Sequence, residues 1–368
     1  MPREIRMVLS FRTKEIQVTM ARTVVVIGVG VMGSAIAFPL AENSNKVRMV
    51  GTPFDKDLIT ECKQFGKHSR LDRPFPHGVE FYYFEQLDEA LEGVDFVIGG
   101  ISSYGAQWFL DNVLAVLDPS IPILSVVKGL VTKPDGRILT FPEHWDEELS
   151  RRGFHRDIYM LGGPGTAGEI MAHDHTMTTF CGPDDEVLRM MKKALSTPYL
   201  HVSLTHDTVG LEYAVAIKNA YALAPAMAIG QGNRKRATEG SNVNAQAAAF
   251  FQASREMTRI LHMVGADDES ISMGIGDLYV TVMGGRTRKL GILLGEGLPY
   301  REAMEVLDGM TLESVAAVKS LAEGLTIKMD KGEVKREDFP LIMHIYDVIY
   351  NGKKADFPWK SFTFENIG

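Results

Sequence analysis

The stretch VVVIGVGVMGSAIAF, residues 24–38, constrains the fold of this chain more than any other part of the sequence. Residues 24–27 form a β-branched run, which predicts a short buried strand. Residues 34–43 predict a helix, and Gly28, Gly30 and Gly33 lie between the two at GxGxxG spacing. A strand, these glycines and a helix in immediate succession predict a βα unit that binds a dinucleotide.

The three glycines have separate physical tasks in such a turn. Gly28 permits the tight turn, Gly30 lets the backbone approach a pyrophosphate, and Gly33 allows close packing of the helix on the strand. The N-terminus of the helix adds N–H donors and the positive end of its dipole. The positions that we predict to bind the cofactor in this half are Gly28, Gly30, Val31, Met32, Gly33, Thr52 and Ser102.

Further short apolar runs continue the pattern of a doubly wound sheet. They lie at residues 46–51, 94–100, 122–127 and 159–163, with helical stretches such as residues 84–93 between them. After residue 204 the sequence changes to long helical segments rich in Ala and Met. The segments are predicted at residues 207–229, 242–264, 300–306 and 312–322.

These patterns predict an α/β fold in which an N-terminal Rossmann-type doubly wound sheet is followed by an all-α C-terminal domain. We expect an N-terminal extension at residues 1–20, a dinucleotide-binding domain at 21–204 and a helical substrate-binding domain at 205–368. Residues 1–19 are either a native extension or a start-site artefact, since Met20 directly precedes the structured sequence. Ligands of open α/β sheets bind at the carboxyl ends of the strands, so we expect the active site between the domains.

The end of the second predicted strand bears on the choice of cofactor. The residue that binds an adenosine ribose lies about 20 residues past the glycine fingerprint. The sequence there reads Gly51-Thr52-Pro53, without a carboxylate that repels a 2′-phosphate. NADP is therefore tolerated, with Thr52 available to bond it, whereas Asp55 or a backbone group is available to serve NAD. The sequence allows NADP or NAD and favours NADP only slightly.

The composition limits the partners of the chain. The 39 Lys and Arg against 47 Asp and Glu give a net charge of −8 without a long basic run, which argues against nucleic acid and anionic membranes as partners. No stretch has the apolar length for membrane insertion. Cys62 and Cys181 lie far apart, which favours the reducing cytoplasm. His173-Asp174-His175 lacks a third ligand at useful spacing, so we expect a surface turn and no metal.

A lysine interrupts the apolar helix predicted at GLEYAVAIKNAYALA, residues 210–224. Leu211, Ala214, Val215, Lys218 and Ala222 share one face at helical spacing, so Lys218 is predicted to face the interior. A buried ammonium is costly unless it is paired or used. The alternative is a lysine whose stem is buried and whose charge reaches water.

Six blocks occur in a fixed order along the chain. They are GVGVMGSA at 28–35, SVVKGL at 125–130, GGPGTAGEI at 162–170, GLEYAVAIKNAYALA at 210–224, NAQAAAFFQASREM at 244–257 and GIGDLYVTVMGGRTRKLG at 274–291. Over nearly all of residues 22–352 the chain resembles the NAD(P)-dependent glycerol-3-phosphate dehydrogenases, in the archaeal and bacterial form. The resemblance implies reversible hydride transfer between NAD(P)H and dihydroxyacetone phosphate, giving sn-glycerol 3-phosphate, and a homodimer.

The resemblance also implies roles for particular residues. Lys218 matches the proton donor near the ketone, and Lys128 matches a lysine that positions substrate and cofactor. Arg286 matches an arginine that contacts phosphate, a task for which a guanidinium is suited, and it is assigned to both substrate and cofactor. Ala167 matches a position whose backbone approaches the nicotinamide. Glu313 matches an acidic or amide residue near the cofactor.

The chemistry of the residues agrees with this assignment. Reducing a ketone creates an alkoxide that needs a proton, and a lysine whose pKa is lowered by burial and by nearby cations is a suitable general acid. Asp277 is predicted to orient Lys218 and to shift its pKa in the opposite direction, which completes a catalytic set with Lys128. We expect the polar lining of the substrate site to include Asn219, Thr281 and Thr287.

Three positions depart from the family pattern. Gln246 and Gln252 stand where basic residues are usual, and Thr287 stands where asparagine is usual. These changes leave open a dehydrogenase of the same fold that acts on another phosphorylated hydroxyketone, sugar phosphate or hydroxy acid. A different class of function is a sensor that binds the cofactor without catalysis. Such a sensor has no chemical use for the three catalytic candidates.

Overall fold

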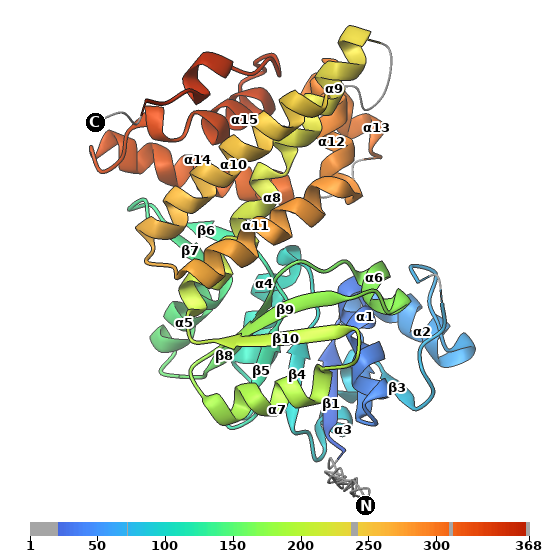
Figure 1. The fold of residues 1–368 in the computed structure, drawn as a ribbon. Helices are drawn as coiled ribbons and strands as arrows, with labels where there is room; N and C mark the ends of the chain where they lie inside the picture. Colours follow the sequence, from blue (N-terminus) through green and yellow to red (C-terminus); the bar gives the residue numbers. More distant parts are fainter. Residues whose placement is uncertain (1–20, 72, 237–241, 309–311, 366–368) are drawn as a thin grey trace, which may run out of the picture.

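The computed structural model describes residues 21–365 apart from residues 72, 237–241 and 309–311, so the predicted extension at 1–20 lies outside the described residues. A parallel-dominated sheet with helices on both faces occupies the first half, and helices occupy the second half (Figure 1). The predicted fold class, a doubly wound sheet followed by an all-α region, is confirmed.

The main sheet of the described chain has eight strands in the order β10-β9-β8-β5-β4-β1-β2-β3. Neighbouring strands are parallel except β8 and β9, which are antiparallel. The strands are β1 Thr23–Ile27, β2 Lys46–Val50, β3 Val79–Tyr82, β4 Phe96–Gly99, β5 Ile123–Ser125, β8 Ile158–Gly162, β9 Thr176–Cys181 and β10 Leu200–Thr205. The sequence pattern predicted five of these and missed β3, β9 and β10.

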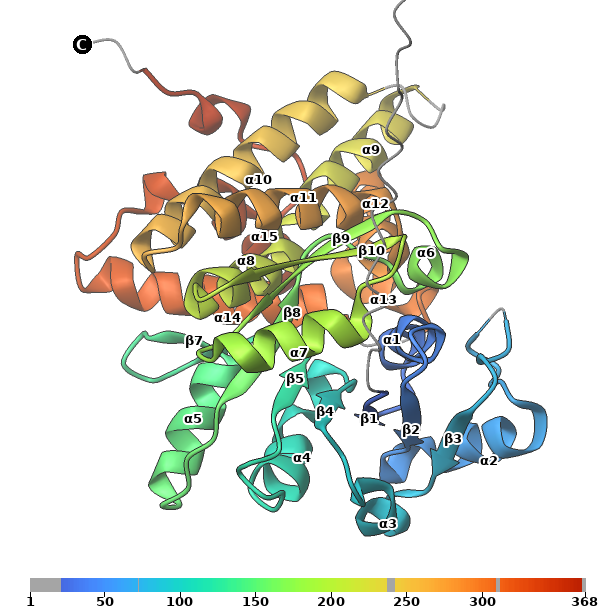
Figure 2. The same ribbon diagram turned by 60° about the horizontal axis from the view of Figure 1, so that its bottom comes forward.

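Helices cover both faces of the sheet (Figure 2). They are α1 Val31–Glu42, α2 Lys56–Phe65, α3 Leu87–Leu91, α4 Ala106–Phe109, α5 Phe141–Arg151, α6 Ala167–Ala172 and α7 Asp185–Leu195. Three short 3-10 turns, η1 Pro53–Asp55, η2 Phe84–Gln86 and η3 Ser103–Gly105, and the π-helical segment η4 Leu110–Leu114 complete this half. Strand β1 shows why its sequence is apolar throughout. Val24 and Val26 pack with α1 and α7, whereas Val25 and Ile27 pack with α4 and α5 on the opposite face.

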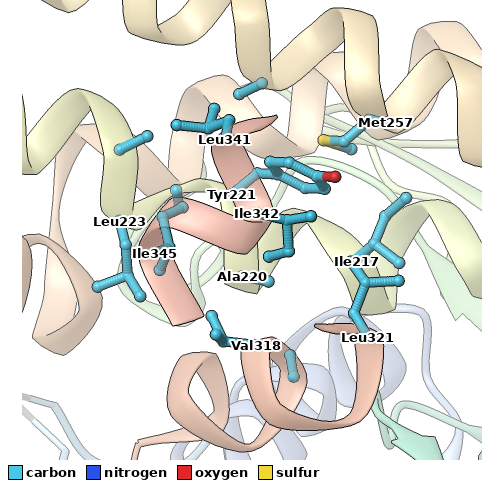
Figure 3. Close-up of a cluster of buried hydrophobic side chains, with 14 of the residues drawn as sticks. Ile217, Ala220, Tyr221, Leu223, Met257, Val318, Leu321, Leu341, Ile342 and Ile345 are labelled. Carbon is cyan, nitrogen blue, oxygen red and sulfur yellow. The ribbon is translucent and has the colours of Figure 1, made fainter. Parts of the chain in front are cut away.

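The second half is built around α8. Its helices are α8 Thr208–Tyr221, α9 Leu223–Arg236, α10 Val243–Met263, α11 Asp268–Met283, α12 Gly285–Glu296, α13 Tyr300–Val306, α14 Glu313–Asp330 and α15 Pro340–Tyr350, with η5 Arg336–Asp338 and η6 Trp359–Phe362. Figure 3 shows Ile217 and Tyr221 of α8 among side chains of α14 and α15, including Leu321 and Ile342. Nearly every residue of α8 is buried, so a polar side chain on it needs a partner inside the protein.

Helix α8 ends at Tyr221 and α9 begins at Leu223. Pro225 explains the break because it has no N–H to donate to the carbonyl of Tyr221.

A two-stranded hairpin, β6 Leu130–Thr132 and β7 Ile138–Thr140, stands apart from the main sheet. Leu130 and Ile138 belong to the hydrophobic core of the helical half. Thr132 Oγ1 donates to the carbonyl of Ser320 in α14 at 2.6 Å. A segment of the first half of the sequence therefore packs with the helices of the second half, where Figure 1 shows it below α8 and α14.

Candidate functional site

One carboxylate holds two lysines where the two halves of the chain meet. Lys218 Nζ of α8 donates to Oδ1 of Asp277 in α11. Lys128, in the loop between β5 and β6, places its Nζ 3.3 Å from Oδ2 of the same carboxylate. Asp277 is 0% exposed and Lys218 is 7% exposed. The structure thus brings together the three predicted catalytic residues, which come from three distant parts of the sequence.

The surroundings of Lys218 lower its pKa. Burial, and next the positive charge of Lys128, lower the pKa of Lys218 to about 8, while Asp277 and Glu313 act in the opposite direction. A lysine with a pKa near neutrality exchanges its proton more readily than one at its ordinary value of 10.5. The prediction that Lys218 faces the interior is confirmed, and its charge does not reach water freely.

Linked helix caps align Lys218 with Asp277. Asp207 accepts the N–H of Gly210 at the start of α8 and also the N–H of Asp267, which caps α11. Lys218 follows Asp207 by 11 residues and Asp277 follows Asp267 by 10, so both lie about 15 Å along their helices. Since α8 and α11 start together and pack side by side, the ammonium and the carboxylate lie at the same height.

The close approach of α8 and α11 needs a glycine. A Cβ on Gly274 in α11 would lie 2.7 Å from the Cβ of Ala214 in α8, which is too close for real side chains. The small residues in these two blocks therefore let the helices approach closely enough for Lys218 to reach Asp277.

The other predicted substrate residues lie on the same helices or next to them. Thr281 Oγ1 donates to the carbonyl of Asp277 at 2.7 Å, which turns its hydroxyl back onto α11. Asn219 follows Lys218 and is half-buried, as is Thr287 in the first turn of α12. Arg286 precedes Thr287 on that turn and is exposed. The rim of the site thus carries an arginine and a hydroxyl.

The opposite wall of the site comes from the loop after β4. Ser102, predicted to contact cofactor, is exposed in this loop, and η3 follows it directly. Tyr104 in η3 lies near the helical half, since burial and the charge of Glu313 raise the pKa of its hydroxyl while Arg286 opposes them. Sequence reasoning missed Tyr104. Its only signal is its place two residues after Ser102, at the carboxyl end of a strand.

The glycine turn has the geometry that a pyrophosphate requires. Gly28 has φ +101°, and a Cβ there would lie 2.8 Å from the carbonyl oxygen of Gly100, a glycine after β4 that sequence reasoning missed. A Cβ on Gly33 would lie 2.6 Å from the carbonyl oxygen of Gly28. At Gly30, by contrast, the nearest atom is at 3.5 Å. Gly28 and Gly33 are therefore required by the protein itself, whereas Gly30 keeps the space over the turn open.

The N-terminus of α1 fits a phosphate as well. Within the described chain, no side chain caps α1 at Gly30, and its first turn holds no acidic residue. Val31 is exposed and Met32 is half-buried on this turn. The first N–H groups of α1 are thus available to an anion, and the turn fits the pyrophosphate of a dinucleotide.

Two further predicted cofactor residues lie at strand ends. Ala167 is the first residue of α6 and is buried. In the loop that precedes α6, Gly163 lies close to Met273 of α11. Thr52 follows β2, and both its N–H and its hydroxyl donate to Oδ2 of Asp55, at 3.0 and 2.7 Å. The carboxylate of Asp55, which the sequence offers as an alternative group for NAD, therefore lies at the end of β2 and is bound to Thr52.

The departures at Gln246 and Gln252 have a different meaning in the structure. Gln252 is buried in α10 and donates to Oε1 of Glu256 at 2.8 Å. Glu256 accepts the N–H groups of Leu341 and Ile342 at the start of α15. Gln252 is thus part of the core of the helical half. Gln246 is half-buried earlier in α10.

The other cysteines and histidines of interest lie elsewhere. Cys62 and Cys181 are free and buried. His173 contacts Oε1 of Glu42 at 2.9 Å, and His175 contacts His201 at 3.0 Å on the surface. The described residues contain no group of three or more His, Cys, Asp or Glu that fits a metal ion. None of the described helices has the length and apolar character to span a membrane.

Comparisons with known proteins agree with this geometry. Residues 23–188 match the model of the NAD-dependent glycerol-3-phosphate dehydrogenase N-terminus, and residues 207–358 match that of the C-terminus. The NADP(+)-dependent glycerol-3-phosphate dehydrogenase of Archaeoglobus fulgidus is 32% identical over 90% of this chain and 96% of its own length. The glycerol-3-phosphate dehydrogenase [NAD(P)+] of Myxococcus xanthus is 28% identical over 90% of this chain and 93% of its own.

Solved structures show the same fold. The glycerol-3-phosphate dehydrogenase of Coxiella burnetii superposes with a TM-score of 0.76 at 22% identity, covering 93% of this chain and 98% of that one. The enzyme of Saccharomyces cerevisiae gives a TM-score of 0.73 at 24% identity, with the same coverage.

Proposed function

The chain belongs to the family of NAD-dependent glycerol-3-phosphate dehydrogenases, and from this premise we propose that it interconverts dihydroxyacetone phosphate and sn-glycerol 3-phosphate with NAD(P)H or NAD(P). The observation that carries the proposal is the sharing of one buried carboxylate by two lysines where the two halves of the chain meet. The bound nicotinamide supplies or accepts the hydride at C2 of the substrate.

In ketone reduction, Lys218 gives its proton to the oxygen on C2, where negative charge develops. In alcohol oxidation, the neutral amine of Lys218 takes that proton back. Asp277 holds the ammonium of Lys218 in place and keeps its pKa from falling further. Lys128, on the other oxygen of Asp277, keeps a second positive charge next to the reacting oxygen.

The charges of the site suit a phosphorylated substrate. Lys128, Lys218 and Arg286 carry three positive charges against the two negative charges of Asp277 and Glu313, on a chain whose net charge is −8. We assign the phosphate of the substrate to Arg286, because a guanidinium binds phosphate oxygens in pairs. Asn219 and Thr287 supply hydrogen bonds beside it.

The cofactor lies, in this proposal, along the turn of Gly28, Gly30 and Gly33 with its pyrophosphate on the N-terminus of α1. Val31, Met32, Ser102 and Glu313 line its path, and the backbone at Ala167 faces its nicotinamide. Thr52 and Asp55 lie at the adenosine end.

We further infer a homodimer in the cytoplasm. Apolar side chains on α10 and α11 are exposed, among them Phe251, Tyr279 and Met283, and such a surface suits a second copy of the chain. The two free cysteines suit a reducing compartment. Sedimentation at micromolar concentration tests the dimer, and a monomer at all concentrations would exclude it.

The reaction is tested by the loss of reduced-nicotinamide absorbance on addition of dihydroxyacetone phosphate, with NADPH and NADH in parallel. Lys218→Met should lower kcat about 10³-fold because it removes the proton donor, while cofactor binding, followed by fluorescence, survives. Lys319→Met removes an exposed lysine of α14 as the control and should change neither quantity. Faster turnover of a non-phosphorylated ketone by the wild type would contradict the role of Arg286.

A further inference from the structure

A single hydroxyl lies between two carboxyl groups at the end of the hairpin. Thr140, the last residue of β7 and the cap of α5, places Oγ1 2.6 Å from Oε2 of Glu212 and 2.9 Å from Oε2 of Glu143. A threonine hydroxyl has one hydrogen and cannot donate to both carboxylates. Both contacts are hydrogen bonds at the same time only if one of the two carboxyl groups carries a proton and donates to Thr140.

The surroundings place that proton on Glu212. Its side chain is buried in α8, and burial raises the pKa of Glu212 to about 8, with Thr140 opposing this shift and the charge of Glu143 adding to it. Glu143 is less buried, accepts the N–H of Thr140 at 2.7 Å, and lies in the first turn of α5, where the helix dipole favours negative charge.

The other titratable groups around Glu212 give its anion no support. Cys181 of β9 and Tyr213 of α8 lie near it; burial raises the pKa of each, and a negative charge on Glu212 raises it further. Glu143 of α5 is itself acidic. Among the described residues, no cation contributes to the pKa shift of Glu212. Ionisation of Glu212 would thus place a second negative charge next to Glu143 inside the protein, with no positive charge to compensate it.

The hydrogen bond between Glu212 and Thr140 joins the helix of Lys218 to the hairpin of Lys128. Glu212 precedes Lys218 by six residues on α8. Lys128 lies two residues before β6, and Thr140, the last residue of β7, pairs with Leu130, the first residue of β6, so both lie at the open end of the hairpin. On β6, Thr132 donates to the carbonyl of Ser320, and Ser320 Oγ donates to the carbonyl of Leu130 at 3.2 Å. Both strands of the hairpin are thereby fixed to the helical half.

We propose that Glu212, in its protonated form, is a positioning residue for Lys128, holding the hairpin against α8 so that the ammonium of Lys128 stays on Asp277. The proposal rests on the function proposed above, since it assumes that Lys128 acts at the reacting centre. In this proposal the hairpin is held in place by the helical half of the chain. When Glu212 ionises, the single hydroxyl hydrogen of Thr140 can serve only one of the two carboxylates. One of these hydrogen bonds is then lost, and the repulsion between Glu212 and Glu143 loosens the end of the hairpin next to Lys128.

The test compares Glu212→Gln with the wild type across pH. A glutamine amide donates to Thr140 at every pH, so the variant should keep the hairpin closed. Above pH 8, kcat/KM for ketone reduction should fall about tenfold per pH unit in Glu212→Gln, from Lys218 alone, and approach a hundredfold per unit in the wild type, from both groups. Glu256→Gln, a second buried carboxyl in the helical half, should keep the steep decline of the wild type.

Hydrogen exchange supplies a readout that does not depend on activity. Protection of residues 130–140, corrected for intrinsic rates, should fall above pH 8 in the wild type and in Glu256→Gln but not in Glu212→Gln. Thr140→Val, which removes the shared hydroxyl, should lower this protection at every pH and raise KM for dihydroxyacetone phosphate.

Equal pH slopes and equal protection in the wild type and Glu212→Gln would overturn the proposal, as would wild-type KM and protection in Thr140→Val. If the wild type does not reduce dihydroxyacetone phosphate at all, the proposed function fails. The exchange data still decide whether Glu212 holds the hairpin.

Discussion

The glycine turn and the lysine centre are two parts of the candidate site, and they are built in opposite ways. The turn around Gly28 works by the absence of side chains, so that backbone N–H groups at the start of α1 stay free for an anion. The lysine centre works by side chains alone, with two ammonium groups on the single carboxylate of Asp277.

This difference predicts which property each region loses when it is mutated. The turn is local, since its parts lie within six residues, and its failure should appear first in cofactor binding. The lysine centre spans segments as far apart as residues 128 and 277, and it depends on the packing of α8, α11 and the hairpin. Its failure should appear in the chemical step and in stability together.

The most damaging change should be Asp277→Asn. The two lysines then lose their shared counter-charge inside the protein, so the pKa of Lys218 falls further and its ammonium is no longer held. We expect kcat to fall about 10³-fold and the free energy of unfolding to fall by about 3 kcal/mol. Steady-state kinetics and urea unfolding measure the two. Asp330→Asn, an exposed acid at the end of α14, is the matched control. Wild-type stability in Asp277→Asn would mean that the lysines do not depend on this carboxylate.

The glycines of the turn should separate stability from binding. Gly28→Ala forces an L residue to φ +101° and places its methyl against Gly100, so we expect it to lose about 1–3 kcal/mol of stability as well as cofactor affinity. Gly30→Ala meets no atom closer than 3.5 Å, so its melting temperature should match the wild type. Its methyl fills the approach of the pyrophosphate, and the Kd for NADPH should rise roughly tenfold. Equal effects of both variants on stability would contradict this view of the turn.

The pH dependence should distinguish the directions of the reaction. Because burial and Lys128 lower the pKa of Lys218 to about 8, ketone reduction, which needs the ammonium, should decline as pH rises through 8. Alcohol oxidation, which needs the amine, should increase over the same range. The measurement is cleanest in Glu212→Gln, where one of the two groups that titrate near pH 8 is removed. Opposite slopes assign the proton transfer to Lys218, and parallel slopes exclude it.

The contrast between a local turn and a centre built from distant segments also explains which features could be predicted from the sequence. The turn was predicted from the residues alone, because the strand, glycines and helix are adjacent and each has a local signature. The burial of Lys218 also followed from helical periodicity. Strand β9 was missed because Thr176, Thr178 and Thr179 interrupt its apolar residues, although they are buried. Strand β10 was missed because Leu200, Val202 and Leu204 alternate with polar residues, so that no continuous apolar run marks it.

The pairing of Lys218 with Asp277, by contrast, is set by the linked caps Asp207 and Asp267, which no periodicity reveals. We expected this pairing from the chemistry of ketone reduction and from the resemblance to a family. The contact of Glu212 with Thr140 joins residues 72 positions apart, and Tyr104 reaches the helical half from a loop. Such contacts depend on how the hairpin and the loop pack on the helices, and the sequence gives no local sign of them.

The smallest predicted effect concerns the adenosine end of the turn. Asp55 accepts two hydrogen bonds from Thr52, so its carboxylate lies where a 2′-phosphate is expected to approach. In Asp55→Asn the amide oxygen still accepts from Thr52 while the negative charge is removed. Relief of this repulsion is worth about 1 kcal/mol near the surface, so the ratio of kcat/KM for NADPH over NADH should rise about fivefold. Asp57→Asn, on the exposed side of α2, should leave the ratio unchanged. If Asp55→Asn also leaves it unchanged, the adenosine ribose lies away from β2, and the turn binds the pyrophosphate without reading the rest of the cofactor.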